Sequence, residues 1–266
     1  MKLVRRTNAI LLALILLAAP LVAADKVVDL SNEHVGRPPT VFEPIVGTWV
    51  VVQDGAEKVI MVDGRPWVAS KDSPTKLLIE GARKLYGTTN EELMDNAKQF
   101  AYYPVAILTS VDNFSNGSIS VKFKTIAGDA DRCSGILFNV KPTGDWLAVR
   151  YNDTENNVAL WEFHNGIRRP VKFSDRSKPF MLEKSAWHDL KMSVDGGYFK
   201  AWLDGALALE FTLGSEPGPR RDGSAANPDL LPANNPVLRP PVSGRIGLWS
   251  KTDSTSYFKE YVVSPK

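Results

Sequence analysis

Short runs of alternating apolar and polar residues, separated by turn residues, fill the chain from Gly117 onward. In residues 118–124, Ile119, Val121 and Phe123 alternate with serine and lysine side chains. Successive side chains of a strand point to opposite faces, so this segment is expected to be a half-solvated antiparallel strand. The same reasoning predicts strands at residues 134–140, 146–152, 157–163, 189–194, 198–203, 244–250 and 257–263. A series of short strands of this kind predicts an all-β antiparallel sandwich.

The N-terminal half of the chain is more mixed. Residues 47–52 and 58–62 are expected to be strands joined at the turn Asp54-Gly55, because glycine adopts positive φ at little cost. Residues 89–97 predict one short helix, since a threonine and an asparagine can cap it and two glutamates follow near its positive end. One short helix among many strands leaves the all-β class unchanged.

A proline-rich segment interrupts the strand series near the C-terminus. Residues 214–241 contain seven prolines. Proline cannot donate the hydrogen bonds that a central strand needs. We therefore expect residues 213–243 to form a long loop inserted between two strands.

The first 24 residues have the three parts of a secretory signal peptide. Lys2, Arg5 and Arg6 form a basic start, residues 9–17 are apolar, and Ala24 ends an exit of small residues. The apolar run is shorter than the roughly 20 residues that a membrane-spanning helix needs, although an N-terminal membrane anchor is the alternative. We expect removal of residues 1–24, a single mature domain over residues 25–266, a periplasmic or secreted location, and no membrane contact after cleavage.

Charge and cysteine content exclude two further classes. The formal net charge is +2 and no basic block is present, so nucleic acid is not an expected partner. Cys133 is the one cysteine of the chain, which rules out an internal disulfide. Its place just before an apolar strand favours a structural thiol over a nucleophile.

Several segments of the strand series carry a family resemblance. They read SGILF at 134–138, WLAVRYN at 146–152, ENNV at 155–158, WHDL at 187–190 and, most specifically, GRIGLWSKTDS at 244–254. This pattern resembles the concanavalin A-like lectin/glucanase superfamily, and more closely the bacterial exported group called 3-keto-disaccharide hydrolase domain, or domain of unknown function 1080. Laminin G-like (LamG-like) jelly rolls share several of these features more loosely.

The resemblance implies a two-sheet antiparallel jelly-roll sandwich with carbohydrate as its partner. It does not imply catalysis, because many members of the superfamily only bind. Members of the closer group often have a Gly-Gly pair and an acidic pair in the last strand, where this chain has Ser134-Gly135 and Lys259-Glu260. That departure weakens any transfer of a mechanism.

The spacing of the acidic residues along the sequence identifies no catalytic pair. Glycosidases commonly use two carboxylates, but the Glu-x-Asp-x-x-Glu pattern of laminarinase-type members is absent from the sequence. The name of the closer group suggests 3-keto sugars, where a single base and a metal or cationic stabiliser permit elimination. His164, His188 and Glu155 are the candidates for that base. Structural roles in a turn and at a strand entrance are the alternative for the two histidines.

The segment 152–157 is rich in oxygen ligands of the kind that calcium prefers. Asp153 and Glu155 would be its carboxylate ligands. A turn in which asparagine and aspartate side chains bind their own backbone explains the same residues without a metal. The three histidines are scattered, so no zinc spacing is present.

Strand parity identifies a candidate ligand surface. Trp146, Arg150 and Asn152 share one face of their strand, and Trp249 and Lys251 share one face of another. If both strands belong to one sheet, these side chains form a single solvent-facing surface, on which indole rings stack against sugars and planar polar groups bind hydroxyls. The alternative is that both tryptophans pack under the proline-rich loop as a second core. Two further tryptophans, 161 and 187, are assigned to packing.

Three functions are compatible with these observations. The leading interpretation is an exported carbohydrate-recognition jelly-roll domain that binds a glycan on an aromatic and arginine-lined sheet face. The second is an enzyme that cleaves 3-keto glycosides as a hydrolase or lyase. The third is an adhesion module that contacts protein.

Overall fold

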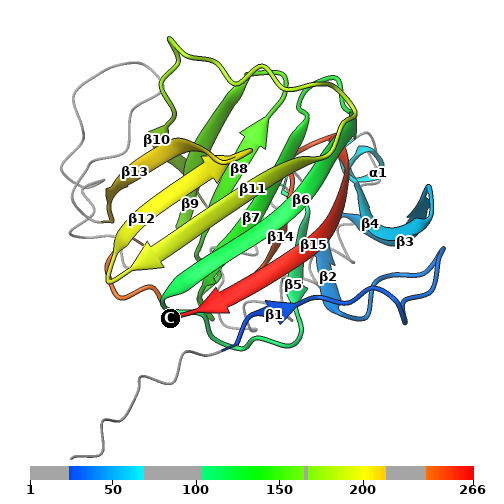
Figure 1. The fold of residues 1–266 in the computed structure, drawn as a ribbon, viewed down its shortest axis with the longest axis horizontal. Coiled ribbons are helices and arrows are strands. Elements are labelled where there is room, and N and C mark those ends of the chain that lie inside the picture. The colour runs from blue at the N-terminus through cyan, green and yellow to red at the C-terminus, as the bar shows by residue number, and fades with distance from the viewer. Residues whose placement is uncertain (1–23, 69–102, 165–166, 214–237) are drawn as a thin grey trace, which may run out of the picture.

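The computed structural model describes residues 24–68, 103–164, 167–213 and 238–266. In this part, the chain forms two antiparallel sheets that pack face to face (Figure 1). The one helix in these ranges is the short α1 (Arg65–Val68). The expected signal peptide, the expected helix at 89–97 and residues 214–237 of the expected proline-rich loop lie outside the described residues. The described ranges contain no helix that is long and apolar enough to cross a membrane.

The first sheet has eight strands, with the last strand of the chain near its middle. In spatial order it contains β13 (Ala206–Thr212), β12 (Tyr198–Leu203), β11 (His188–Asp195), β6 (Gly117–Ala127), β15 (Thr255–Pro265), β4 (Glu57–Asp63) and β3 (Thr48–Asp54), with β1 (Lys26–Val27) beside β15. The turns at Asp54-Gly55, Gly196-Gly197 and Asp204-Gly205 join neighbouring strands as expected.

The second sheet has seven strands. In spatial order it contains β10 (Ile167–Phe173), β9 (Asn157–His164), β8 (Trp146–Asn152), β7 (Cys133–Val140), β14 (Arg245–Trp249), β5 (Val105–Leu108) and β2 (Phe42–Val46). The alternation pattern did not predict β2, β5, β10 or β13. Prolines stand in β2 and β10, which are the two edges of this sheet, where a missing backbone N–H is tolerated.

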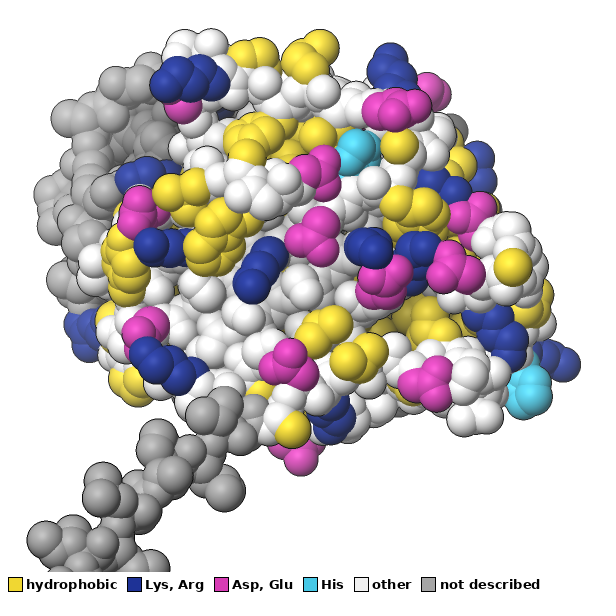
Figure 2. All heavy atoms as spheres, viewed as in Figure 1, with side chains coloured by type: hydrophobic (Ala, Val, Ile, Leu, Met, Phe, Trp, Pro, Cys, Tyr) yellow, Lys and Arg dark blue, Asp and Glu magenta, His cyan; other side chains and the backbone are white. Residues whose placement is uncertain are grey.

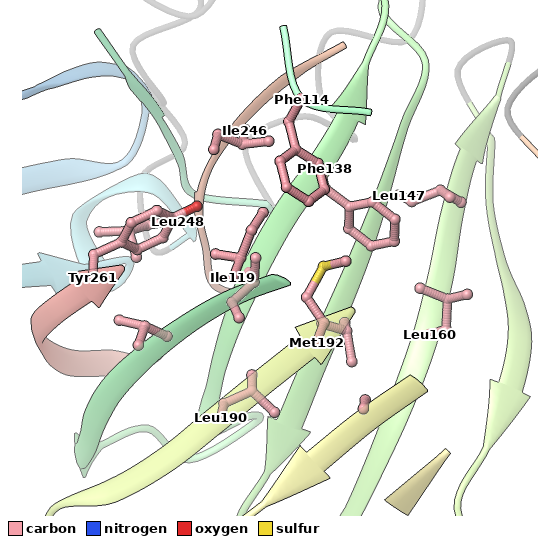
Figure 3. Close-up of a cluster of buried hydrophobic side chains, with 14 of the residues drawn as sticks. Phe114, Ile119, Phe138, Leu147, Leu160, Leu190, Met192, Ile246, Leu248 and Tyr261 are labelled. Atoms are coloured by element: carbon pink, nitrogen blue, oxygen red, sulfur yellow. The ribbon is translucent and has the colours of Figure 1, made fainter. Parts of the chain in front are cut away.

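The main core lies between the two sheets (Figure 3). Ile119, Leu190 and Met192 come from the eight-stranded sheet and face Phe138 and Leu147 of the seven-stranded sheet. All five side chains are fully buried. At about 25 cal/mol per Å² of buried apolar surface, this layer is the main source of stability. The alternation that predicted β6 therefore places its apolar side chains in the core.

The outer face of the eight-stranded sheet is polar (Figure 2). Acidic and basic side chains pair across its strands: Lys122 with Glu260 at 2.6 Å, and Lys200 with Glu210 at 3.2 Å. Figure 2 shows the two signs of charge interspersed over this face. This sheet is a half-solvated antiparallel sheet, as the sequence predicts.

A large part of the outer face of the seven-stranded sheet is apolar and buried. We call this second cluster the outer layer; it consists of Ile45, Val46, Val105, Ile107, Cys133, Leu137, Val140, Trp146, Ala148, Phe163 and Trp249. Every residue of β7 and β8 is therefore buried. Burial raises the pKa of the Cys133 thiol to about 12, so it is protonated at neutral pH, in agreement with a structural role.

Candidate functional site

A cleft of about 640 Å³ opens beside the outer layer, at the end of the seven-stranded sheet where β9 and β10 lie. Its wall comes from the β8–β9 turn, from β9 and β10, from the segment after β10, and from the residues after β14. The described residues that line it are Glu155, Asn156, Asn157, Trp161, Arg168, Pro170, Phe173, Arg176, Pro179 and Lys251. Aromatic, amide and charged side chains thus meet in one concave surface.

The β8–β9 turn presents Glu155 to this cleft. Asn152 Oδ1 accepts hydrogen bonds from the backbone N–H of Thr154 at 3.1 Å and from its hydroxyl at 2.8 Å. Asn156 has a φ of 52°, a left-handed conformation that asparagine adopts more readily than most residues. These two asparagines shape the turn, which explains why the segment 152–157 is rich in amide side chains.

A buried arginine holds the cleft carboxylate. Arg150 is 1% exposed, and its Nη2 donates to Glu155 Oε2 at 2.6 Å. Its Nη1 donates to the backbone oxygen of Asn157 at 3.0 Å and also to the Asn157 side chain. Burial would raise the pKa of Glu155, but the charge and hydrogen bond of Arg150 hold that pKa below its ordinary value. Glu155 is therefore an ionised, oriented carboxylate at neutral pH.

A second buried ion pair fixes Lys251. Its Nζ lies 2.8 Å from both carboxylate oxygens of Asp131, a residue that is 5% exposed. Asp131 also accepts hydrogen bonds from Asn152 at 3.0 Å and from Thr252 at 2.7 Å. Lys251 therefore enters the cleft as a positioned donor whose charge Asp131 balances.

Arg168 and Trp161 form the aromatic and cationic part of the cleft wall. The Arg168 guanidinium carbon lies 3.8 Å from the centroid of the Trp161 ring and 5.0 Å from that of Tyr103. Burial lowers the pKa of Arg168 below its ordinary value. Among the described residues, neither Arg168 Nη1 nor Trp161 Nε1 has a hydrogen-bond partner. Both atoms are sealed from solvent within the wall, and a buried donor left unpaired costs about 1–3 kcal/mol.

A second pair of an aromatic ring and a cation, Phe173 and Arg176, extends this wall of the cleft. Phe173 meets Trp161 edge to face, with centroids 5.7 Å apart and planes at 87°. The Arg176 guanidinium carbon lies 4.4 Å from the Phe173 centroid. Two arginines thus lie over two adjacent aromatic rings, and the in-plane N–H groups of a stacked guanidinium remain able to bind a ligand.

The prediction that the strands of Arg150 and Trp249 belong to one sheet, with both side chains on the same face, is confirmed. β8 and β14 belong to one sheet, and the register aligns Trp249 with Gly135 and Gly135 with Arg150. Side chains at aligned positions point to the same face, so Trp146, Arg150 and Trp249 share the outer face of this sheet.

The expectation that this shared face is open to solvent is wrong for the two tryptophans. Trp146 is 1% exposed and Trp249 is 0% exposed. Tyr103 stacks on Trp249 with centroids 6.1 Å apart and planes at 15°, and it meets Trp146 edge to face at 6.0 Å. Both tryptophans belong to the outer layer, which matches the alternative of a second core. The proline-rich residues 214–237, named as the cover in that alternative, lie outside the described residues.

The other predicted ligand residues have different places. Lys251 lines the cleft. Arg150 is buried and reaches the cleft only through Glu155 and Asn157. Asn152 is fully buried and bonds to Asp131 and Thr154, so it shapes the turn instead of facing the cleft.

Trp161, which sequence reasoning assigned to packing, lines the cleft. It aligns with Ala148 in the β8–β9 register, so its parity matches that of Trp146 and could have identified it. Arg168 was missed because the mixed residues of β10 do not alternate. Trp187 contacts the other sheet, where its Nε1 donates to Asp54 Oδ2 at 3.2 Å.

The two candidate histidines do not line the cleft, whereas Glu155 does. His188 Nδ1 lies 2.7 Å from Asp204 Oδ2, and its Nε2 lies 2.9 Å from the backbone oxygen of Glu183. His164 Nδ1 lies 3.1 Å from Asp145 Oδ2, although at an angle that forms no hydrogen bond. The contacts of His188 are those of a structural residue.

The residues considered as calcium ligands have other partners. Asp153 Oδ2 lies 3.0 Å from Arg132 Nη1, and Glu155 is bound by Arg150. An arginine beside each carboxylate disfavours a cation at the same oxygens. No group of three or more His, Cys, Asp or Glu side chains in the described ranges is placed to hold a metal ion. The side chains of this turn therefore do not fit a calcium site.

No family model and no curated protein matches this chain. Among solved structures it is similar to the carbohydrate binding module CBM66 from Bacillus subtilis, with a TM-score of 0.50, 14% identity, and coverage of 85% of this chain and 96% of that chain. It also matches an apo Crh5 transglycosylase (TM-score 0.47, 14% identity, 92% and 85% covered). A third match is a putative glycosyl hydrolase from Parabacteroides distasonis ATCC 8503 (TM-score 0.42, 18% identity, 61% and 87% covered).

The similarity to CBM66 shows the fold. The described part of the chain is an antiparallel jelly-roll sandwich, the fold of that carbohydrate binding module. The fold class predicted from the sequence is confirmed.

Proposed function

We propose that the cleft lined by Trp161, Arg168 and Lys251 binds a carbohydrate. The observation that carries this proposal is the meeting of two aromatic rings with fixed polar groups in one cleft of about 640 Å³. Sugars pack their C–H faces on aromatic rings and hydrogen-bond their hydroxyls to planar polar groups. The cleft supplies both kinds of contact.

The electrostatic arrangement of the cleft supports the same proposal. Buried partners hold Glu155 and Lys251 in place, so they lose little conformational freedom when a ligand binds. Sugar hydroxyls act as donors toward Glu155 and as acceptors toward Lys251. The similarity to a carbohydrate binding module adds support at the level of the fold. We extend this to an exported location, because residues 1–24 have the pattern of a signal peptide.

The test is calorimetric titration of the chain with a panel of neutral and acidic oligosaccharides, repeated with Trp161→Phe. This substitution keeps an aromatic ring and removes Nε1–H, which has no partner among the described residues. Because Arg168 lies on this ring, the smaller ring should misplace the guanidinium, and the affinity of the ligand should fall about 3- to 10-fold. The fold should be unaffected.

Trp187→Phe is the matched control, because it removes an indole N–H on the other sheet, where the partner is Asp54. The Trp187→Phe variant should bind each oligosaccharide with the affinity of the unmodified chain. If no oligosaccharide binds and a protein partner does, the chain is the protein-contact module considered in the sequence analysis. Equal losses in both variants would also contradict the proposed place of binding.

A second candidate function is cleavage of a 3-keto glycoside, which the sequence resemblance suggested. The observation that favours it is Glu155, the one carboxylate of the described cleft lining. Glu155 would take the proton from the carbon between the ketone and the glycosidic carbon, and Lys251 or Arg168 would stabilise the enolate charge. Collapse of the enolate to the enone would break the glycosidic C–O bond, and the leaving oxygen would take up a proton from Glu155 or water. Hydrolysis by a pair of carboxylates is not supported, because the described lining residues include no second carboxylate beside Glu155. Adding a 3-keto disaccharide to the panel and following product release tests this candidate.

A further inference from the structure

We infer that the ligand of this cleft is an anionic glycan, whose carboxylate or sulfate group binds between Arg168 and Arg176. This inference rests on the proposed carbohydrate function and names the class of sugar that the site takes. It follows from the charges of the cleft, from their partners and from the geometry of the two arginines.

The described lining carries three basic side chains, Arg168, Arg176 and Lys251, against the single carboxylate of Glu155. Two of these four charges are balanced from behind the cleft: Asp131 pairs with Lys251 and Arg150 pairs with Glu155. Two positive charges therefore remain. A cleft with an excess of one sign concentrates ligands of the other sign.

The two remaining arginines form no ion pair with a described residue. This contrasts with the outer face of the eight-stranded sheet, where Lys122, Lys200 and Lys259 each lie within 3.2 Å of a glutamate carboxylate oxygen. Arg168 differs further because it is half-buried, and this burial lowers its pKa. Holding a guanidinium there without a counter-charge is costly unless a ligand brings one.

The geometry suits an oxyanion. Arg168 lies over Trp161 and Arg176 lies over Phe173, and these two rings contact each other edge to face. Each guanidinium lies over a ring, and its N–H groups that do not point at that ring remain for the two oxygens of a carboxylate or sulfate. The sugar ring then contacts the part of Phe173 that remains exposed.

The experiment uses matched pairs of probes that differ only in charge. An oligogalacturonide is compared with its methyl ester, and dextran sulfate with dextran, by calorimetric titration of the chain. We expect one or both anionic probes to bind at least about 10-fold more tightly than the neutral partner, as one or two charge-assisted hydrogen bonds provide. Preference for the first pair assigns a carboxylate, and preference for the second assigns a sulfate.

Arg168→Gln and Arg176→Gln should each weaken anionic binding about 10- to 100-fold. Arg176 is exposed, so its replacement leaves the fold intact even if Arg168→Gln lowers stability. The control is Arg37→Gln, an exposed arginine beside β3 of the other sheet, which should bind as the unmodified chain does. Polyglutamate, an anion without sugar, should bind at least about 10-fold more weakly than the preferred glycan.

Three results would overturn the inference. Equal affinity for the charged and neutral members of both pairs would leave carbohydrate binding intact and refute the anionic ligand. Equal affinity for polyglutamate would reduce the effect to general charge attraction. No binding of any glycan would refute the proposed function itself, and the inference with it.

Discussion

Gly135 lies on β7 between two large side chains of the neighbouring strands, Arg150 on β8 and Trp249 on β14. A Cβ at this position would lie 2.7 Å from the backbone oxygen of Val149, 3.0 Å from Arg150 Cβ and 3.2 Å from Trp249 Cε3. Glycine is therefore required by close packing. At the residue scale, Arg150 can hold Glu155 from its place on β8 because Gly135, its neighbour on β7, has no side chain.

Gly135→Ala is expected to destabilise the protein by about 1–3 kcal/mol, the usual cost of overpacking. The neighbouring Ser134→Ala is a matched control. Ser134 is fully buried, and its hydroxyl has no hydrogen-bond partner among the described residues, so removing the hydroxyl should be neutral or stabilising. Urea denaturation of the two variants measures the difference. Equal stability of the two variants would contradict the packing described for Gly135.

The connection between β6 and β7 shows how an element depends on a distant one. Asp253, in the loop between β14 and β15, accepts hydrogen bonds from the backbone N–H groups of Asp129, Ala130 and Asp131 at 2.6, 3.1 and 3.1 Å. This clamp fixes Asp131, which in turn binds Lys251. Burial would raise the pKa of Asp253, but the backbone hydrogen bonds hold it below the ordinary 3.8.

Asp253→Asn is expected to lower stability at pH 7 by about 1–2 kcal/mol, because a neutral amide accepts these hydrogen bonds more weakly. A carboxylate whose pKa is lowered on folding stabilises the folded state above its unfolded pKa, near 3.8. That stabilisation is lost as the pH falls through the lower folded pKa. The difference in stability between Asp253→Asn and the unmodified chain should therefore shrink below pH 3.8.

Denaturation curves at pH 7 and at successively lower pH values test this linkage. Asp112→Asn serves as the control, since Asp112 is exposed, and its stability should follow that of the unmodified chain at every pH. A difference for Asp253→Asn that stays constant with pH would show that its carboxylate is not the source of the effect.

At the scale of the whole molecule, the first and the last strand of the described residues meet in one sheet. β15 pairs with β6 on one side and β4 on the other, and β1 pairs with its last residues. In Figure 1 this last strand crosses the middle of the eight-stranded sheet. It buries Phe258, Tyr261 and Val263 in the main core. The fold therefore depends on pairings between distant segments, which are slow to form.

A chain that ends at Ser254 is expected to lose cooperative unfolding. The three buried side chains of β15 contribute about 1.5–3 kcal/mol each, which is comparable with the entire stability of a typical domain. The cut would also expose the edges of β4 and β6. Removal of Lys266 alone is the control and should cost less than about 1 kcal/mol, because its ion pair with Asp195 is exposed. Circular dichroism during urea titration distinguishes the two, and a cooperative transition in the shorter chain would contradict the role given to β15.

The sequence alone determined most of the strands and their parity, but not β2, β5, β10 or β13. The alternation around Ile119, the glycines at turns and the shared parity of Arg150 and Trp249 are all properties of neighbouring residues, and the geometry of a strand converts them directly into faces. The series of short strands predicted the sandwich and the resemblance predicted its jelly-roll form, which the similarity to CBM66 shows.

Only the tertiary structure decided which faces meet water. Trp249 is buried because Tyr103, from a distant segment, stacks on it, and strand periodicity carries no information on what covers an outward face. The cleft likewise combines the β8–β9 turn, β10 and Lys251, which follows β14. These three segments lie near one another only because of the order of the strands in the sheet. Local chemistry therefore fixed where each side chain points. The packing of segments far apart in the chain fixed what it contacts, because solvent exclusion depends on the whole molecule.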